Sequence, residues 1–254
     1  MIRIASFDIG RCNFAQYIEE FDPNILINLE KRYSSLSFKE RQRSSDQILK
    51  ETVLCGKRVS TGVYDFTDSD LPDGDRQDLS IRLYLLAHLS KFERLWRSCD
   101  IFVIEQQYFN TRDKSDANID AIKMGEGVFM WFLDRYPFKT ICYFGSQFKT
   151  RIFNAPRKLT KARRKKWAIE ITRSFYKDRG DKEMINIFNL AEAVKRKQIK
   201  TKARAESFKN LYPCHSPDTT ELSEKIINKQ KLDDVSDAFL QCQAFKFKRM
   251  VTLS

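Results

Sequence analysis

The chain of 254 residues carries a formal net charge of +12, with 42% hydrophobic and 31% charged residues. This composition is too apolar for a disordered chain and too polar for a membrane-spanning one, and the length fits one large domain. The N-terminal residues show neither the long apolar segment nor the cleavage site of a signal peptide, and the six cysteines form no CxxC pair. We therefore expect free thiols in an intracellular protein that binds no membrane.

The first part of the chain predicts strands followed by a polar segment. Residues 2–9 alternate and are rich in β-branched side chains, which predicts a strand, and residues 13–19 and 24–29 look like further strands of a meander. The segment 33–77 is polar and charged. We expect an insertion here, with a short helix over residues 39–52.

The rest of the chain alternates between helical and strand patterns. Apolar residues recur at helical spacing in four places, and two short apolar runs between them are typical of buried strands. The expected elements are a helix over 79–96, a strand over 101–104, a helix over 119–133, a strand over 140–144, a helix with Trp167, Ile171 and Phe175 on one face, and a last helix from about 232 with Val235, Phe239 and Cys242 as its apolar stripe. This order predicts an α/β protein with helices packed on a sheet.

Positive charge is concentrated in residues 149–204. This region holds 19 basic and 5 acidic residues, a net charge of +14, so the rest of the chain has a net charge of −2. Such clustering is typical of proteins that bind a polyanion, and we expect nucleic acid rather than an anionic membrane. The candidate phosphate-binding residues are Lys149, Arg151, Lys161, Arg163, Arg164, Lys165 and Lys166.

Carboxylates stand at informative places in three segments. Asp8 lies within an apolar strand (SFDIG), Glu105 ends another (FVIEQQ), and the last helix opens with Asp233, Asp234 and Asp237 (DDVSDA). Asp234 and Asp237 are three residues apart and share a helix face. Each acid alone is equally typical of a loop or a helix cap. Acids that converge repel one another, however, and a divalent cation relieves that repulsion.

The chemistry of these side chains selects the metal. Carboxylate oxygens favour Mg²⁺, with Mn²⁺ as a substitute. Two such ions cleave a phosphodiester by activating water and stabilising the leaving oxygen. An acidic metal site beside a basic region therefore predicts a nuclease. The sequence contains no GxxxxGK[ST] motif, so we expect no nucleotide cofactor.

Three motifs, SFDIGRCNFA, VIEQQ and KLDDVSDAFLQ, occur in this order. Together they resemble the RuvC-type Holliday junction resolvases of the RNase H-like superfamily, in particular the poxvirus branch and its relatives in other large cytoplasmic DNA viruses. Asp8 matches the first acid of that family, Glu105 the second, and Asp234 with Asp237 the final pair. Asp233 falls outside the pattern.

The resemblance implies an α/β, RNase H-like fold, in which helices flank a mixed central sheet. It covers most of the chain, leaves out residues 33–77 and weakens across residues 180–228. We therefore expect one nuclease domain over residues 1–254 that contains the insertion 33–77 and the basic DNA-binding region 149–204.

The function implied by the resemblance is a magnesium-dependent endonuclease with two ions per site. It would resolve four-way DNA junctions by paired nicks, in viral recombination or the processing of replication intermediates (concatemers) in the cytoplasm. Two opposed nicks need two active sites, so we expect a homodimer, with Met130 and Trp131 of the 119–133 helix off its core face. Two alternatives stay open: a nuclease of the same fold for other branched DNA or RNA–DNA hybrids, and a non-catalytic DNA-binding protein.

Overall fold

A five-stranded sheet forms the centre of the protein. The structure, a computed structural model, describes residues 1–10, 12–66, 77–108, 116–195 and 231–252. The strand order is β3-β2-β1-β4-β5. The strands are β1 (Ile2–Asp8), β2 (Phe14–Phe21), β3 (Lys57–Tyr64), β4 (Ile101–Gln106) and β5 (Thr140–Gly145). β1, β2 and β3 pair antiparallel, whereas β4 and β5 run parallel to β1.

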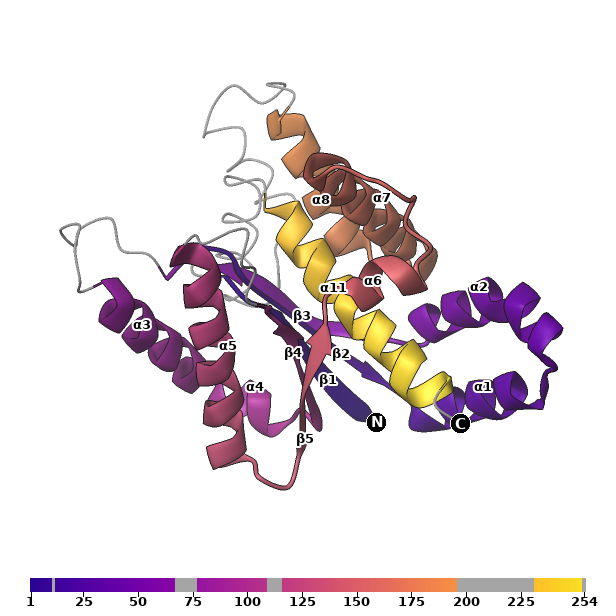
Figure 1. The fold of residues 1–254 in the computed structure, drawn as a ribbon, viewed down its shortest axis with the longest axis horizontal. Helices are drawn as coiled ribbons and strands as arrows, with labels where there is room; N and C mark the ends of the chain where they lie inside the picture. Colours follow the sequence, from indigo (N-terminus) through magenta and orange to yellow (C-terminus); the bar gives the residue numbers. More distant parts are fainter. Residues whose placement is uncertain (11, 67–76, 109–115, 196–230, 253–254) are drawn as a thin grey trace.

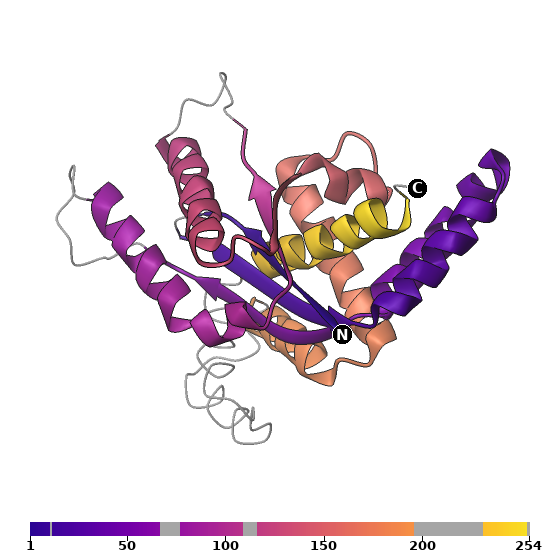
Figure 2. The same cartoon turned by 90° about the horizontal axis from the view of Figure 1, so that it is seen from below.

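Helices cover both faces of this sheet (Figures 1 and 2). One face carries α3 (Gln77–Lys91), α4 (Glu93–Arg97) and α5 (Asp116–Arg135). The other carries α1 (Pro23–Ser35), α2 (Phe38–Leu54), α6 (Gln147–Ile152), α7 (Lys161–Arg179), α8 (Lys182–Lys195) and α11 (Leu232–Lys246), which continues as a short π-helix, η1 (Phe247–Val251). The result is an α/β protein in which helices flank a mixed central sheet, as the sequence motifs imply.

Two further expectations can be compared with the described part of the chain. No helix within it is long and apolar enough to cross a membrane. Within it, Cys55, Cys99, Cys142 and Cys242 are free thiols, as expected. Cys214 lies outside the described residues.

Strand β1 separates two hydrophobic cores. Ile4 belongs to the core under α11, whereas Ala5 and Phe7 belong to the core under α3 and α5. Successive side chains of a strand point to opposite faces of the sheet. Asp8, which follows Phe7 at the end of β1, therefore points to the α11 side.

The strand expected over residues 24–29 is wrong, because these residues belong to helix α1. The Asp22 side chain accepts a hydrogen bond from the backbone N–H of Asn24 at 3.0 Å, and Pro23 stands in the first turn. Both features favour the start of a helix. Leu26 and Leu29, at a spacing that suits a helix face, are both buried.

The segment 33–77 contributes to the sheet as well as interrupting it. The helix expected over residues 39–52 is confirmed as α2, which begins with a capping box formed by Ser37 and Glu40. β3 follows and pairs with β2. What separates β2 from β3 is thus the helical hairpin α1–α2, and residues 67–76 lie outside the described residues.

Helix α11 is enclosed on nearly all sides. Of its fifteen residues, only Asp233 and Asp237 are not buried. The expected stripe of Val235, Phe239 and Cys242 is part of the core, but the polar side chains of α11 are buried as well. These are Ser236, Gln241, Gln243 and Lys246.

The buried carboxylate of Glu19 on β2 accounts for two of these polar residues. Glu19 has no exposed surface and lies 2.5 Å from Lys246 Nζ and 2.9 Å from Arg179 Nη2. Gln243 donates a further hydrogen bond at 2.8 Å. Although burial acts in the opposite direction, the two cations lower the pKa of Glu19 from 4.5 to about 2. The network ties β2 to both α7 and α11.

Replacement of Glu19 by Gln should destabilise the protein strongly. The variant leaves Lys246 and Arg179 without their carboxylate, and breaking a buried pair in this way costs about 3–5 kcal/mol. Urea unfolding at pH 7 measures this loss. The exposed pair of Lys166 and Glu170, 3.6 Å apart, supplies the control, because Glu170→Gln should cost less than about 1 kcal/mol.

Acidification should cause the same loss of stability in the wild-type protein. A carboxyl group with a lowered folded-state pKa stabilises the fold above its unfolded pKa, and this contribution disappears as the pH falls through the folded value. For Glu19 that window extends from pH 4.5 down to about 2. Equal stabilities of wild type and Glu19→Gln at pH 7 would contradict the role of this network.

Candidate active site

Two parallel strands bring the first two acids of the site together. Phe7 of β1 pairs with Ile104 of β4, so Asp8 and Glu105 follow side by side at the same edge of the sheet. Both point to the α11 face, and their carboxyl groups share a hydrogen bond. Burial raises the pKa of Asp8 well above its ordinary value, and the adjacent Glu105 raises it further.

Lys149 joins this pair to the N-terminal part of α11. Its ammonium lies 3.0 Å from Glu105 Oε1 and 3.4 Å from Asp237 Oδ1. Although burial acts in the opposite direction, Lys149 lowers the pKa of Glu105. Burial likewise opposes ionisation of Lys149, but Asp237 and Glu105 raise its pKa above the ordinary value. The structure thus brings three of the four expected acids around one cation.

Lys149 has a different environment from the one expected of a phosphate-binding residue. Its side chain is only 7% exposed, because α6 directs it into the acidic cluster instead of onto the surface. The sequence signal for this role is its position shortly after β5, at the edge where Asp8 and Glu105 lie.

Asp234 lies beside the cluster and not at its centre. It is buried, and its Oδ2 accepts no hydrogen bond from any residue that the structure describes. Burial and the neighbouring Asp233 raise the pKa of Asp234 to about 7, and Asp237 contributes in the same direction. Asp233, which falls outside the motif of matched acids, forms an ion pair with Lys165 of α7.

Gln241 fixes α11 against the two acidic strands, a role that sequence reasoning missed. Its side-chain amide donates to the backbone oxygens of Phe7 at 3.1 Å and Val103 at 3.2 Å. Gln241 follows Asp237 by one helical turn and therefore shares its face. These bonds set the position of Asp237 relative to Asp8. In the sequence, the signal for this role was a polar residue, Gln241, among the mainly apolar residues of the last helix.

The chemistry of the cluster fits a hard divalent cation. All four acids offer only oxygen ligands, the donor type that Mg²⁺ and Mn²⁺ prefer. Among the described residues, one buried oxygen of Asp234 has no hydrogen-bond partner, and the Asp8 and Glu105 carboxyls lie in contact. Within the described residues, no three acidic, histidine or cysteine side chains, as they are placed, could together hold a metal ion. Lys149 balances part of the negative charge instead.

The expected phosphate-binding residues occupy two surfaces. Lys161, Arg163, Arg164, Lys165 and Lys166 are all exposed at the start of α7. Arg163 and Arg164 form no ion pair with a residue that the structure describes, whereas Lys165 pairs with Asp233 and Lys166 with Glu170. α7 thus carries free positive charge close to the N-terminal end of α11.

Arg151 belongs to the second surface, together with two residues that sequence reasoning missed. Arg151 and Lys248 both lie over the ring of Phe148, with Lys248 Nζ 3.2 Å from its centroid. Partial loss of hydration, Arg249 and Arg151 lower the pKa of Lys248. No carboxylate within the described ranges pairs with these three cations. Lys248 and Arg249 belong to η1, which follows α11. Only the folded chain brings them close to α6, so the sequence alone could not group them with Arg151.

The chain has viral relatives among curated proteins. It is 26% identical over 191 residues to the uncharacterized protein 97L of Invertebrate iridescent virus 3, covering 67% of this chain and 84% of that protein. It is 27% identical over 257 residues to the uncharacterized protein 170L of Invertebrate iridescent virus 6, covering 97% and 89%. No protein-family model matches the chain.

Several solved structures are also similar to it. The fowlpox virus resolvase in complex with Holliday junction DNA is 13% identical with a TM-score of 0.44, over 97% of this chain and 98% of that one. Thermus thermophilus RuvC is 8% identical with a TM-score of 0.47, over 98% of each chain. The yeast mitochondrial Holliday junction resolvase is 9% identical with a TM-score of 0.47, over 96% and 78%. The similar structures are thus Holliday junction resolvases and RuvC, the proteins named above for the three sequence motifs.

Proposed function

We propose that this chain is a structure-selective endonuclease that resolves four-way DNA junctions by paired, metal-dependent phosphodiester nicks. The convergence of Asp8, Glu105 and Asp237 around Lys149, at the edge of the sheet, carries the proposal. Holding several carboxylates in contact costs free energy. A role in binding a catalytic divalent cation would account for this arrangement. The same cluster disfavours the alternative of a non-catalytic DNA-binding protein.

Each residue of the cluster has a proposed role. Asp8, Glu105, Asp234 and Asp237 would hold Mg²⁺, or Mn²⁺ in its place, as two ions per site. Bound there, the ions would supply an activated water and stabilise the leaving oxygen. Lys149 neutralises part of the acidic charge and keeps the carboxylates close together.

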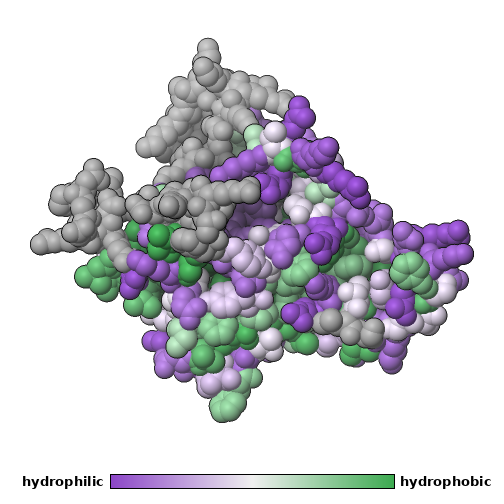
Figure 3. Space-filling model, in the orientation of Figure 1, coloured by the Kyte–Doolittle hydropathy of each residue, from purple (hydrophilic) through white to green (hydrophobic). Residues whose placement is uncertain are grey.

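Positive charge provides the proposed DNA-binding surface. Hydrophilic side chains cover the region of α7 and α8, whereas apolar ones gather on the side of α3 and α5 (Figure 3). Arg163 and Arg164 are exposed on α7, near the helix that carries the last two acids. Phosphate contacts position a duplex without reading its sequence, as selection for DNA shape requires. We propose that the whole chain forms one nuclease domain. It would act in the cytoplasm, at the site of viral DNA replication.

A homodimer completes the proposal, because one active site cannot cut two opposed strands together. Exposed apolar side chains suitable for an interface lie on α3, where Leu83 is 58% exposed, and on α5, where Met130 is 52% exposed. The expectation for Trp131 is wrong, because only 5% of it is exposed. Trp131 packs against Phe132 in the core and is not available to a partner.

Asp8→Asn and Asp237→Asn should abolish cleavage while leaving junction binding largely intact. Each substitution removes a negative charge needed for metal binding but keeps the side-chain shape. Nicking of a synthetic four-way junction in Mg²⁺, beside a linear duplex and an RNA–DNA hybrid, is the measurement, and chelation of the metal should stop it. Asp178→Asn, at an exposed pair with Lys50, should cut normally. Near wild-type rates for Asp8→Asn would refute the assignment, and equal cutting of all three substrates would favour the broader nuclease.

Removal of the unpaired cations of α7 should reduce the salt dependence of DNA binding. Each lost phosphate contact lowers the slope of log affinity against log salt by about 0.9 for duplex DNA. Arg163→Ala and Arg164→Ala should therefore act on all DNA shapes alike. Lys165→Ala is the matched control, because Asp233 already neutralises that ammonium. Unchanged slopes for both arginine variants would show that this face does not contact DNA.

Mixed dimers of wild type and Asp8→Asn should nick one strand of a junction and fail to release linear duplex products. Each subunit is expected to cut one of the two opposed strands, so one inactive site stops resolution halfway. Differently tagged subunits, purified together and assayed on a native gel, provide the measurement. Full resolution by a protein that sediments as a monomer, free and on DNA, would rule out the paired mechanism.

A further inference from the structure

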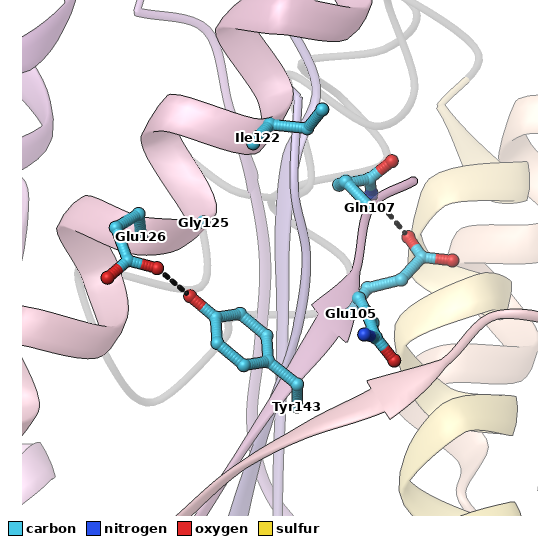
Figure 4. A pocket seen from close by; sticks show the side chains of 7 residues that line it. Glu105, Gln107, Ile122, Gly125, Glu126 and Tyr143 are labelled. Atoms are coloured by element: carbon cyan, nitrogen blue, oxygen red, sulfur yellow. Dashed lines mark hydrogen bonds between the residues drawn. The ribbon is translucent and has the colours of Figure 1, made fainter. Parts of the chain in front are cut away.

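A pocket opens at the ends of β4 and β5, on the α5 face of the sheet. Its volume is about 200 Å³, and it is lined by Glu105, Gln106, Gln107, Ile122, Gly125, Glu126 and Tyr143. In Figure 4 the carboxylate of Glu105 points away from α5 towards α11, where Gln107 reaches it at 3.1 Å. The pocket and the acidic cluster therefore lie on opposite faces of the sheet and meet at its edge.

Gly125 leaves space that the packing of the protein does not require. It lies in the middle of α5, where glycine destabilises a helix relative to alanine. A methyl group at this position would meet no atom of the described residues within 4 Å. A glycine that is costly for the helix and unnecessary for its packing indicates that something outside the chain approaches closely here.

Tyr143 and Glu126 form a fixed polar wall. The Tyr143 hydroxyl donates to Glu126 Oε2 at 2.7 Å, and Phe129 stacks on the Tyr143 ring with 4.9 Å between centroids. Burial and the neighbouring Glu126 raise the pKa of Tyr143, so the hydroxyl remains a donor. Glu126 Oε1 accepts no hydrogen bond within the described ranges, which leaves it available to a ligand.

The lining selects the kind of ligand. The carboxylate of Glu126, which faces the pocket, repels a phosphate. Ile122 and Tyr143 offer apolar and aromatic surface, and the two glutamine amides can donate or accept. A neutral planar group that carries hydrogen-bond donors fits this combination. In a nucleic acid, that description matches a base with an exocyclic amino group.

We propose that the base next to the cleaved phosphate leaves the stack and enters this pocket, where Glu126 accepts a hydrogen bond from its amino group. The inference rests on the proposed nuclease function and deepens it, because it assigns a preference for the sequence at the cut. Its phosphate would lie at the acidic cluster on one side of the sheet edge, and the base on the other side. Thymine, which lacks the amino group, would be disfavoured. Unstacking is easiest where a base is already poorly paired, as near a branch point.

Cleavage of a four-way junction with randomised bases around the branch point tests the inference. Wild type should favour amino-bearing bases over thymine by about tenfold at one position beside the nick. Gly125→Leu, which fills the pocket, and Glu126→Gln, which removes the acceptor charge, should bring that preference to within about twofold. Asp134→Asn is the matched control, because it alters an exposed acid on the same helix, away from the pocket, and should keep the preference.

A fluorescent base gives a second readout that needs no cleavage. In the Asp8→Asn protein, 2-aminopurine at that position should change its emission on binding, and the additional Gly125→Leu substitution should suppress the change. Wild type that cuts junctions without base preference would overturn this inference and leave the proposed function standing. So would emission changes that Gly125→Leu leaves intact. A protein that binds no junction would overturn both.

Discussion

An ionised carboxylate without any exposed surface, that of Glu19, determines where α11 can lie. Burial of a charge is tolerated only if other charges and hydrogen bonds replace water. Lys246 and Gln243 supply them from α11, and Arg179 supplies them from α7. These contacts have directions, unlike the apolar contacts that surround them. They fix the rotation and the height of a helix that is buried on nearly every side, and thereby the position of the acids at its other end.

The acidic cluster follows the same principle with the opposite ratio of charges. At the N-terminal part of α11, Lys149 stands among carboxylates as Lys246 and Arg179 stand beside Glu19. The difference is the ratio of charges, because acids outnumber the cation around Lys149 and cations outnumber the acid at Glu19. The structural network is thus satisfied by the chain alone, whereas the cluster keeps an excess of negative charge. Gln241 lies between them and holds both ends in one register against the sheet.

Local patterns were sufficient to predict most of the fold and to single out three acids that the fold places close together. A buried strand that ends in a carboxylate is unusual enough to single out Asp8 and Glu105, and parallel strands end at one edge of a sheet. The same reasoning failed where one pattern fits two structures: the mainly apolar residues 24–29 fit a strand, but Asp22 and Pro23 start a helix. It also failed where a role depends on distant segments. Lys149 reads as one more basic residue until the fold places α6 beside Asp237.

The hairpin α1–α2 interrupts the sheet between neighbouring strands, but its last turn is also part of the core. Lys246 donates to the backbone oxygen of Thr52 at 2.9 Å, and Arg179 donates to that of Val53 at 2.9 Å. Carbonyls at the end of a helix lack partners and carry partial negative charge, so they offset the second cation beside Glu19. Related chains that join β2 to β3 directly should therefore have lost one of the two cations at the same time. Gain or loss of the hairpin and the residue types at positions 179 and 246 should change together during evolution.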